Sequence, residues 1–283
     1  MKTLISAQDL LAAMRGPRAP VLLDCSFDLT YPEAGARTWR EGHLPGSHYV
    51  HLDHDLAGPK SDAAGRFHGR HPLPDRAVFA ARLGQLGTTP ASAVVCFDAQ
   101  GGPYAARAWW LLRWMGHDDV AVLDGGIAAW RAAGGRLVID ATAVDAAPPY
   151  PSQTPGLPTI DAAALLVQLG RTPLIDARAG ERFRGEVEPL DKAAGHIPGA
   201  RNRFFKDNLV PDGRFKSAAA LRSEWLPLLA GHAAEKVVQQ CGSGVTACHN
   251  LLALAHAGLG DSVLYAGSWS EWSADAARPI AKG

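Results

Sequence analysis

The sequence predicts an α/β protein of two tandem domains, each a mainly parallel sheet flanked by helices on both faces. One observation is an internal repeat, in which four landmarks occur twice and in the same order along the 283 residues. The other is that short, wholly apolar runs alternate in each copy with segments of helical periodicity. Because strands of this kind are buried on both faces, the alternation favours parallel strands covered by helices.

The repeat sets the domain boundaries. Its paired landmarks are Leu22-Leu23-Asp24 with Leu174-Ile175-Asp176, His43–Ser47 with His196–Ala200, Val94-Val95 with Val237-Val238, and Gly126 and Trp130 with Gly267 and Trp272. The second and third landmarks lie farther apart in the first copy, so this copy carries extra residues within 48–93. We assign residues 1–140 to an N-terminal domain, 141–158 to a proline-rich linker and 159–283 to a C-terminal domain.

Each copy contains several predicted strands and helices. The N-terminal copy has strands over 21–23, 93–97 and 120–123, and helices over 7–15, 75–86 and 104–115. The C-terminal copy has strands over 173–175, 236–239 and 262–265, and helices over 161–169, 217–229 and 246–257. Asp161 has the short acceptor side chain that suits a helix N-cap. Ligands of parallel sheets lie beyond the carboxyl ends of the strands, so we expect the functional site there.

Composition excludes several function classes. The 28 basic and 28 acidic residues give zero formal net charge, so we expect neither a nucleic-acid partner nor a membrane surface. No apolar run approaches the ~18–20 residues of a membrane span, and the N-terminus lacks an apolar core suited to export, which favours a cytoplasmic location. The four cysteines form no CxxC pair and are expected to be free thiols. The histidines over 43–71 are irregularly spaced, and we predict neither a metal nor a cofactor.

Cys241 is the candidate nucleophile. It stands between an apolar strand and a helix, at the start of a loop that contains Gly242 and Gly244. These glycines let the backbone curl so that consecutive N–H groups point inward, and the following helix adds the positive end of its dipole. Such a loop stabilises a thiolate, which is the reactive form of cysteine. The alternative is a buried structural cysteine.

Several motifs resemble those of sulfurtransferases built from two tandem rhodanese domains. They are GHLPGS and GHIPGA, DGG followed by tryptophan, GSWSEW and CGSGVTAC, and together they cover essentially the whole chain. The loop CGSGVTA is most similar to that of 3-mercaptopyruvate sulfurtransferases, whereas rhodaneses that use thiosulfate carry charged residues where this chain has Gly242 and Ser243. The resemblance implies that Cys241 takes sulfur from a small anionic donor as a persulfide and passes it to a thiol or cyanide, with thioredoxin among the candidate acceptors.

The resemblance also implies roles for neighbouring residues. Ser243 would move a proton together with His71 and Asp55, which bracket part of the longer segment of the N-terminal copy. The alternative is that His71 and Asp55 are exposed loop residues. In the repeat, Asp98 stands opposite Cys241, so the N-terminal copy is predicted to be catalytically silent. The loop residues expected to bind the substrate through their amides are Gly242, Gly244, Val245 and Thr246.

A donor carboxylate needs a cation, and the resemblance assigns Arg182 to this role. Mercaptopyruvate enzymes usually carry a second arginine directly after Glu-Pro, but this chain has Leu190 there. Arg184 and Lys192 are the candidates for the missing charge. Arg178 is predicted to be a structural ion-pair partner, and the tryptophans of GSWSEW are expected to be core residues.

Three other functions are alternatives, and the sequence argues against two of them. A thiosulfate sulfurtransferase would use the same Cys241 persulfide, and Leu190 favours it. A cysteine-dependent phosphatase needs an arginine six residues after the nucleophile, where this chain has Ala247. A non-catalytic binding module is the third, although the presence of Cys241 argues against it.

Overall fold

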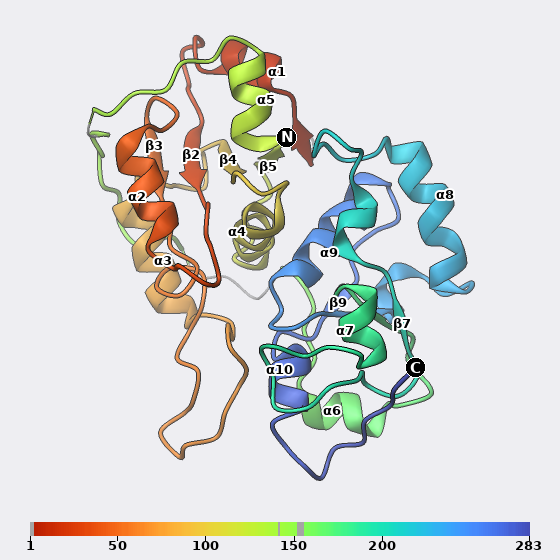
Figure 1. The fold of residues 1–283 in the computed structure, drawn as a ribbon. Coiled ribbons are helices and arrows are strands. Elements are labelled where there is room, and N and C mark those ends of the chain that lie inside the picture. The colour runs from red at the N-terminus through yellow and green to blue at the C-terminus, as the bar shows by residue number, and fades with distance from the viewer. Residues whose placement is uncertain (1–2, 141, 152–155) are drawn as a thin grey trace. The chain divides into compact units, whose positions relative to one another are not determined.

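The computed structural model describes residues 3–140, 142–151 and 156–283 (Figure 1). Residues 141 and 152–155 of the predicted linker lie outside the described residues. The chain forms two compact units. Unit 1 comprises Met1–Gly58, Pro74–Gly156 and Pro211–Phe215, and unit 2 comprises Pro59–Leu73, Leu157–Val210 and Lys216–Gly283. The segment Pro59–Leu73, an orange loop in Figure 1, comes from the first half of the sequence but packs with unit 2.

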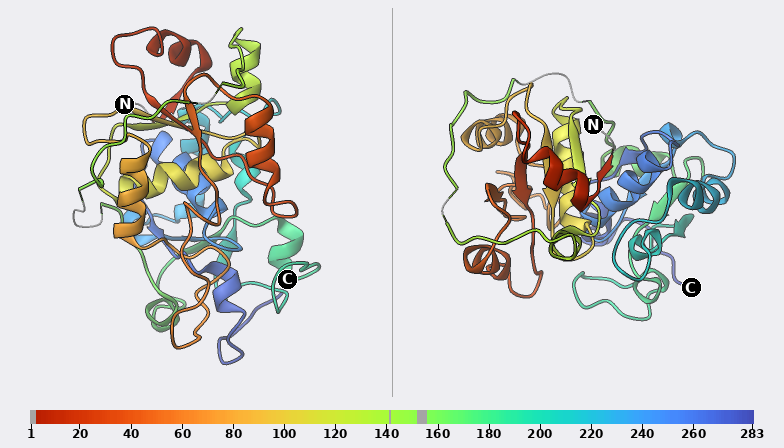
Figure 2. Two further views of the ribbon diagram at one scale, coloured as in Figure 1. Left: turned by 90° about the vertical axis from the view of Figure 1, so that its left-hand side faces the viewer. Right: turned by 90° about the horizontal axis from the view of Figure 1, so that it is seen from above.

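Unit 1 contains a five-stranded sheet in the order β1-β5-β4-β2-β3, with every neighbouring pair parallel. Its strands are β1 (Leu4–Ile5), β2 (Val21–Asp24), β3 (Ser47–Tyr49), β4 (Val94–Phe97) and β5 (Val120–Leu123). Its helices are α1 (Ala7–Ala13), α2 (Ala34–Glu41), α3 (Arg76–Gln85), α4 (Pro103–Trp114) and α5 (Gly126–Ala132). Helices α1 and α5 pack against each other (Figures 1 and 2).

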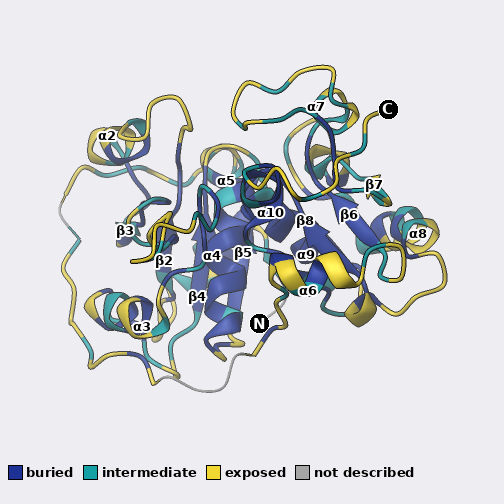
Figure 3. Cartoon of the chain, turned by 90° about the horizontal axis from the view of Figure 1, so that it is seen from below, coloured by how far each residue is buried: buried dark blue, intermediate teal, exposed yellow. Residues whose placement is uncertain are grey.

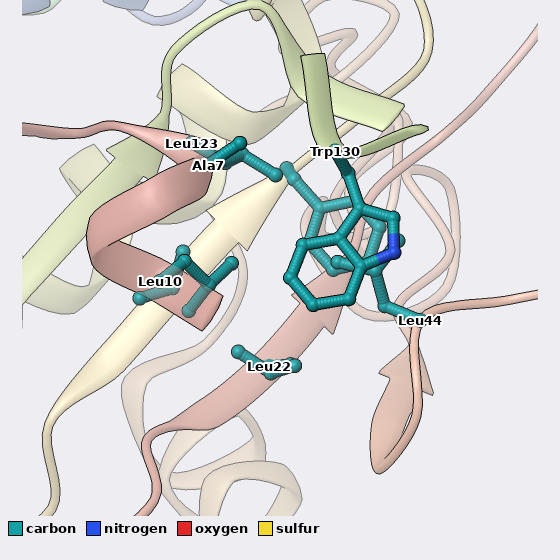
Figure 4. Packing of buried hydrophobic residues seen from close by; sticks show 8 residues of the cluster. Ala7, Leu10, Leu22, Leu44, Leu123 and Trp130 are labelled. Carbon is teal, nitrogen blue, oxygen red and sulfur yellow. The ribbon is translucent and has the colours of Figure 1, made fainter. Parts of the chain in front are cut away.

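The core of unit 1 follows from the alternation of side chains along its strands. Trp130 of α5 packs with Leu10 of α1 and with Leu22 of β2, in a cluster that also contains Val95 and Phe97 of β4 (Figure 4). Successive strand residues point to opposite faces of a sheet. The intervening residues of β4 therefore face the other side, where α4 contacts both β4 and β5. Helices thus flank the sheet on both faces, as predicted.

Unit 2 repeats this plan with a four-stranded parallel sheet in the order β7-β6-β8-β9. Its strands are β6 (Leu174–Asp176), β7 (Ala200–Asn202), β8 (Val238–Gln240) and β9 (Val263–Leu264). Its α-helices are α6 (Ala162–Val167), α7 (Gly180–Arg184), α8 (Ala218–Leu229), α9 (Thr246–His256) and α10 (Ser268–Trp272), and its 3₁₀ helices are η1 (Phe205–Asn208) and η2 (Ala234–Lys236). A parallel bridge between Thr159 and Leu264 stands where β1 pairs with β5 in unit 1.

The predicted fold class is confirmed, and each predicted strand and helix overlaps an observed one. Asp161 caps α6 by accepting a hydrogen bond from the Ala164 amide at 2.8 Å, as predicted. The predicted strand 236–239 begins two residues too early, because η2 occupies its first residue and β8 begins at Val238. The elements that sequence analysis missed have at most 8 residues each: β1, β3, β7, α2, α5, α7, α10 and η1. Most of them span too few residues to establish a period.

Among the longer helices α4 and α9 are the most buried, and they follow equivalent strands in the repeat (Figure 3). Helices α2, α3 and α8 in contrast expose one face, as amphipathic surface helices do. Within the described residues, the helices are too short or too polar for any of them to cross a bilayer.

Candidate active site

Cys241 lies directly after β8, at the carboxyl end of a strand that has β6 on one side and β9 on the other. Hydrogen bonds to the start of α10 hold the loop that follows. The Cys241 amide donates to Ser268 Oγ at 3.1 Å, and the Cys241 carbonyl accepts from the Trp269 amide at 3.0 Å. The Gly242 carbonyl accepts from the Ser270 amide at 2.9 Å. The candidate nucleophile is therefore on a backbone that is fixed at three points.

The two glycines of the loop are required for different reasons. Gly244 has φ = +76°, and a β-carbon there would overlap the carbonyl oxygen of Ala266. A side chain is therefore excluded both by backbone strain and by space. At Gly242 a β-carbon would lie 2.8 Å from Nη2 of Arg70. The space beside Cys241 is thus bordered by a guanidinium group.

The thiol-bearing residue is buried: Cys241 is 1% exposed. Loop residues Ser243 and Val245 are buried as well, and α9 begins at Thr246. The groups next to the loop are polar and charged, because Gly242 faces the guanidinium groups of Arg70 and Arg182. A small anion that entered this region would lose water, but the nearby guanidinium groups would offset the cost of its desolvation.

His71 and Ser243 are brought together by the segment Pro59–Leu73. Nδ1 of His71 lies 2.8 Å from Oγ of Ser243, and both residues are buried. The chain reaches this position through Gly69, where φ is +104° and a β-carbon would lie 2.8 Å from the carbonyl oxygen of Gly267. The next amide, that of Arg70, donates to Ser270 Oγ at 3.1 Å. The segment therefore docks on the same turn that holds the Cys241 loop.

Asp55 belongs to unit 1, and its contacts lie within that unit. One carboxylate oxygen accepts a hydrogen bond from the His51 amide at 2.7 Å, and the other lies 2.8 Å from Nε of Arg82. Both oxygens therefore have partners that fix the carboxylate in place. A role for Asp55 in orienting His71 stays a prediction.

The predicted substrate-binding residue Arg182 lies on α7 and is held by two carboxylates. Its Nη2 lies 2.6 Å from Oε1 of Glu188 and 3.2 Å from Oδ2 of Asp191. Its Nη1 has no hydrogen-bond partner among the described residues and points toward Gly242, at 3.6 Å from the position of a β-carbon there. Arg184, a candidate for the missing charge, instead pairs with Glu186 on the exposed surface.

Arg178 is a structural residue, as predicted. Its side chain is 1% exposed and binds Asp176 through Nε and Nη2, with Nη2 also donating to the Gly195 carbonyl at 2.7 Å. Its Nη1 lies 3.3 Å from Glu188, and the guanidinium carbon lies 4.7 Å from the ring centre of Trp269. The tryptophans of GSWSEW, Trp269 and Trp272, are both fully buried in the core cluster of unit 2, which confirms their prediction.

Sequence analysis missed Arg70. Its Nη1 forms an ion pair with Oδ1 of Asp191, and its Nη2 approaches Gly242. The residue immediately precedes His71, which was already a candidate for the site. This adjacency is a weak signal, because it does not show which way the Arg70 side chain points.

In unit 1, Asp98 occupies the position that Cys241 has in the repeat, directly after β4. Its carboxylate accepts hydrogen bonds from the amides of Gln100, Gly102, Tyr104 and Ala105, at 2.8–2.9 Å. Burial raises the pKa of Asp98, whereas these amide hydrogen bonds lower it. The turn after β4 thus surrounds the carboxyl group of Asp98 with main-chain donors.

One group in unit 1 brings together residue types that bind metals. Ligand atoms of Glu33, His51 and His54 lie within 4.8 Å of one another. The two imidazole rings are stacked, with centroids 4.3 Å apart and planes at 25°. Imidazole lone pairs lie in the ring plane, so stacked rings direct them side by side and not toward one ion. This arrangement does not fit a tetrahedral metal site.

The family model of the rhodanese-like domain matches residues 6–133 and again residues 159–275. The chain belongs to the rhodanese family. The first matched stretch contains strands β2 to β5 of one sheet, and the second contains the whole of the other sheet together with Cys241 and its loop.

Three similar rhodanese-family proteins cover nearly the whole chain. It is 48% identical to the "Probable 3-mercaptopyruvate sulfurtransferase" of Pseudomonas aeruginosa, over 99% of this chain and 98% of the relative. It is 38% identical to the "Putative thiosulfate sulfurtransferase SseB" of Mycobacterium tuberculosis, over 100% and 98%. The structure of a 3-mercaptopyruvate sulfurtransferase from Leishmania major aligns with a TM-score of 0.83 at 28% identity, covering 96% of this chain and 74% of that one. The relatives are thus named for two sulfur donors.

Proposed function

We propose that the chain is a sulfurtransferase that moves sulfur from 3-mercaptopyruvate to a thiol or cyanide acceptor through a persulfide on Cys241. The observation that carries this proposal is the hydrogen bond between Ser243 and His71. Ser243 stands two residues after Cys241, which lies at the carboxyl end of a buried strand. The relatives named as 3-mercaptopyruvate sulfurtransferases support the same donor.

In the first step the Cys241 thiolate attacks the sulfur of the donor, and a sulfur–sulfur bond forms. The carbon–sulfur bond of the donor breaks, and its electron pair remains on carbon as the enolate of pyruvate. This carbanion needs a proton, and the Ser243–His71 pair is the hydrogen-bonded route beside the thiol that supplies it. The amides of the loop from Gly242 to Thr246 stabilise the sulfur anions on either side of the step.

In the second step an acceptor thiolate, or cyanide, attacks the outer sulfur of the persulfide. The bond between the two sulfurs breaks, and its electron pair returns to Cys241 as the thiolate. Donor and acceptor are thus used in turn, which predicts ping-pong kinetics. All four cysteines are free, in keeping with a reducing compartment, and we place the reaction in the cytoplasm with a reduced thiol such as thioredoxin as acceptor. Zero net charge gives no support to a nucleic-acid partner.

The second candidate donor is thiosulfate, which Leu190 and the Mycobacterium tuberculosis relative favour. Attack on its outer sulfur releases sulfite, and the electron pair leaves on sulfur. No carbanion forms, so the reaction needs no proton donor. The Ser243–His71 pair would then have no chemical task, and for this reason we prefer 3-mercaptopyruvate.

Mass spectrometry tests the proposal. Incubation with 3-mercaptopyruvate should add one sulfur to the peptide that contains Cys241, whereas the peptides of Cys25 and Cys96 serve as internal controls and should stay unmodified. Cys248 shares a tryptic peptide with Cys241, so fragment ions must place the added sulfur on Cys241. Cys241→Ser should abolish turnover. Sulfur on another cysteine, or transfer by Cys241→Ser, would contradict the nucleophile.

Steady-state kinetics with both donors separates the two candidate functions. We expect kcat/KM for 3-mercaptopyruvate to exceed that for thiosulfate by at least about tenfold, which is ~1.4 kcal/mol of transition-state preference. A preference for thiosulfate would overturn the choice of donor and leave the Cys241 persulfide in place.

A further inference from the structure

A cluster of charged side chains lies beside the Cys241 loop within unit 2. It consists of Arg70, Arg178 and Arg182 with Asp176, Glu188 and Asp191. The carboxylates are the buried members, since Glu188 and Asp191 have side chains that are each 3% exposed. The arginines differ: the side chain of Arg178 is 1% exposed, whereas those of Arg70 and Arg182 are 20% and 19% exposed. Two guanidinium groups therefore form the accessible side of the cluster.

The nitrogens that do not bind the carboxylates face the loop. Arg70 uses Nη1 for Asp191, and Arg182 uses Nε and Nη2 for Glu188 and Asp191. Among the described residues, Nη2 of Arg70 and Nη1 of Arg182 have no hydrogen-bond partner. Both approach Gly242, at 2.8 and 3.6 Å from the position of a β-carbon there. Two unpaired donors on separate segments thus converge on Gly242, the residue that follows Cys241.

Asp191 fixes the two guanidinium groups relative to each other. Its Oδ1 pairs with Arg70 and its Oδ2 lies 3.2 Å from Arg182, so a single buried carboxylate bridges the segment Pro59–Leu73 and helix α7. Burial raises the pKa of Asp191, and Arg70 lowers it. Because guanidinium groups are planar forks, holding one edge of each sets the direction of the remaining N–H groups.

We propose that Arg70 and Arg182 together bind the carboxylate of the sulfur donor, and that Asp191 is the positioning residue that directs both guanidinium groups toward Gly242. The inference rests on the proposed function and names the substrate class, an α-keto carboxylate. A carboxylate is planar with two acceptor oxygens, which suits two converging guanidinium donors. Arg70 supplies the second cation that Leu190 does not.

The decisive measurement is donor binding without turnover. Cys241→Ser protein should bind 3-mercaptopyruvate, and tryptophan fluorescence or calorimetry measures its Kd. Adding Arg70→Met, which keeps the side-chain length and removes the charge, should raise Kd about tenfold or more, as expected for the loss of a charge-assisted hydrogen bond. The Kd with Arg70→Lys should lie between those of Cys241→Ser alone and of Cys241→Ser with Arg70→Met, because lysine keeps the charge but lacks the planar pair of donors.

Arg66→Met is the matched control. Arg66 lies on the same segment, but its side chain is 74% exposed and pairs with Asp62. This variant should bind the donor as Cys241→Ser does. Equal Kd values for the Arg66 and Arg70 variants would overturn the inference. A wild-type protein that fails to turn over 3-mercaptopyruvate would overturn the proposed function instead, so the two failures are distinguishable.

A double-mutant cycle tests the positioning role of Asp191. Asp191→Asn should weaken donor binding, and Arg70→Met added to it should cost much less than Arg70→Met alone, because Arg70 is already released. Thermal unfolding of each variant checks that the fold is retained. Additive losses would show that Asp191 does not act through Arg70, and an unchanged Kd for Asp191→Asn would remove it from the site.

Discussion

Nδ1 of His71 lies 2.8 Å from Oγ of Ser243, so a residue of the first sequence half is hydrogen-bonded to the loop of the second. The pair lies within unit 2, because the segment that carries His71 packs there. Both residues are buried, which excludes bulk water from competing for this hydrogen bond. This geometry suits the proton transfer that we propose for the imidazole and the hydroxyl.

Ser243→Ala and His71→Asn should each lower kcat/KM for 3-mercaptopyruvate by about 10²-fold, the size typical of a lost general acid. The same variants should change kcat/KM for thiosulfate by no more than about threefold, since sulfite leaves without a proton. Parallel assays of the two donors with one acceptor measure the ratio. Equal losses with both donors would point to a structural role for the pair.

Alanine at the two loop glycines should give opposite outcomes. Gly242→Ala places a methyl group against the end of the flexible Arg70 side chain, so we expect a folded protein with a raised KM for 3-mercaptopyruvate. Gly244→Ala meets backbone and needs a positive φ, so its unfolding midpoint should fall and little activity should remain. Thermal unfolding and kinetics on both variants check this, and a wild-type KM for folded Gly242→Ala would contradict it.

Arg178 should contribute to stability and not to donor binding. Arg178→Met leaves Asp176 buried without its partner, which should lower the free energy of unfolding by about 3–5 kcal/mol. Arg184→Met is the control, because Arg184 pairs with Glu186 on the exposed surface, and it should leave the denaturant midpoint unchanged. Denaturant titration of the two variants gives the comparison. A similar midpoint for both would refute the structural assignment.

Asp24 should make stability depend on pH. Burial raises the pKa of Asp24 to about 6, whereas hydrogen bonds from Ser26 oppose this rise. The folded state then binds a proton more tightly than the unfolded state, so stability falls as pH rises from about 4 to 6. Relative to Asp24→Asn, the wild type should lose up to about 3 kcal/mol across this window. The free energy of unfolding of both proteins at pH 4 and 7 measures it, and a constant difference would rule out this group.

The longer secondary-structure elements could be predicted because their patterns are local. Helix α9, for example, is apolar at helical spacing and ends at the residue before Ala257. The short strand β7 and the helix α7 could not, since three to five residues carry little periodicity. The exact start of β8 was also missed. The first residue of the predicted strand, Lys236, belongs to η2 but directly precedes an apolar run.

The residues of the candidate site likewise differ in whether local sequence reveals them. Cys241 could be found from its own neighbours, since the glycines and the helix that shape its loop adjoin it in the chain. Arg70 could not, because its partner Asp191 and its neighbour Gly242 are far away in the sequence. The amide donors around Asp98 are likewise visible only in three dimensions, although the repeat had already singled out that residue.

The segment Pro59–Leu73 has a consequence for how this duplicated chain can be divided. A fragment that begins after the linker would contain Cys241 and its loop but would lack both Arg70 and His71. On the proposed function, such a fragment would keep the cysteine that carries sulfur but would lose one of the two arginines that bind the donor and the histidine of the proton route. Both sequence halves therefore contribute residues to the candidate site, so we expect the two copies to function only as one chain.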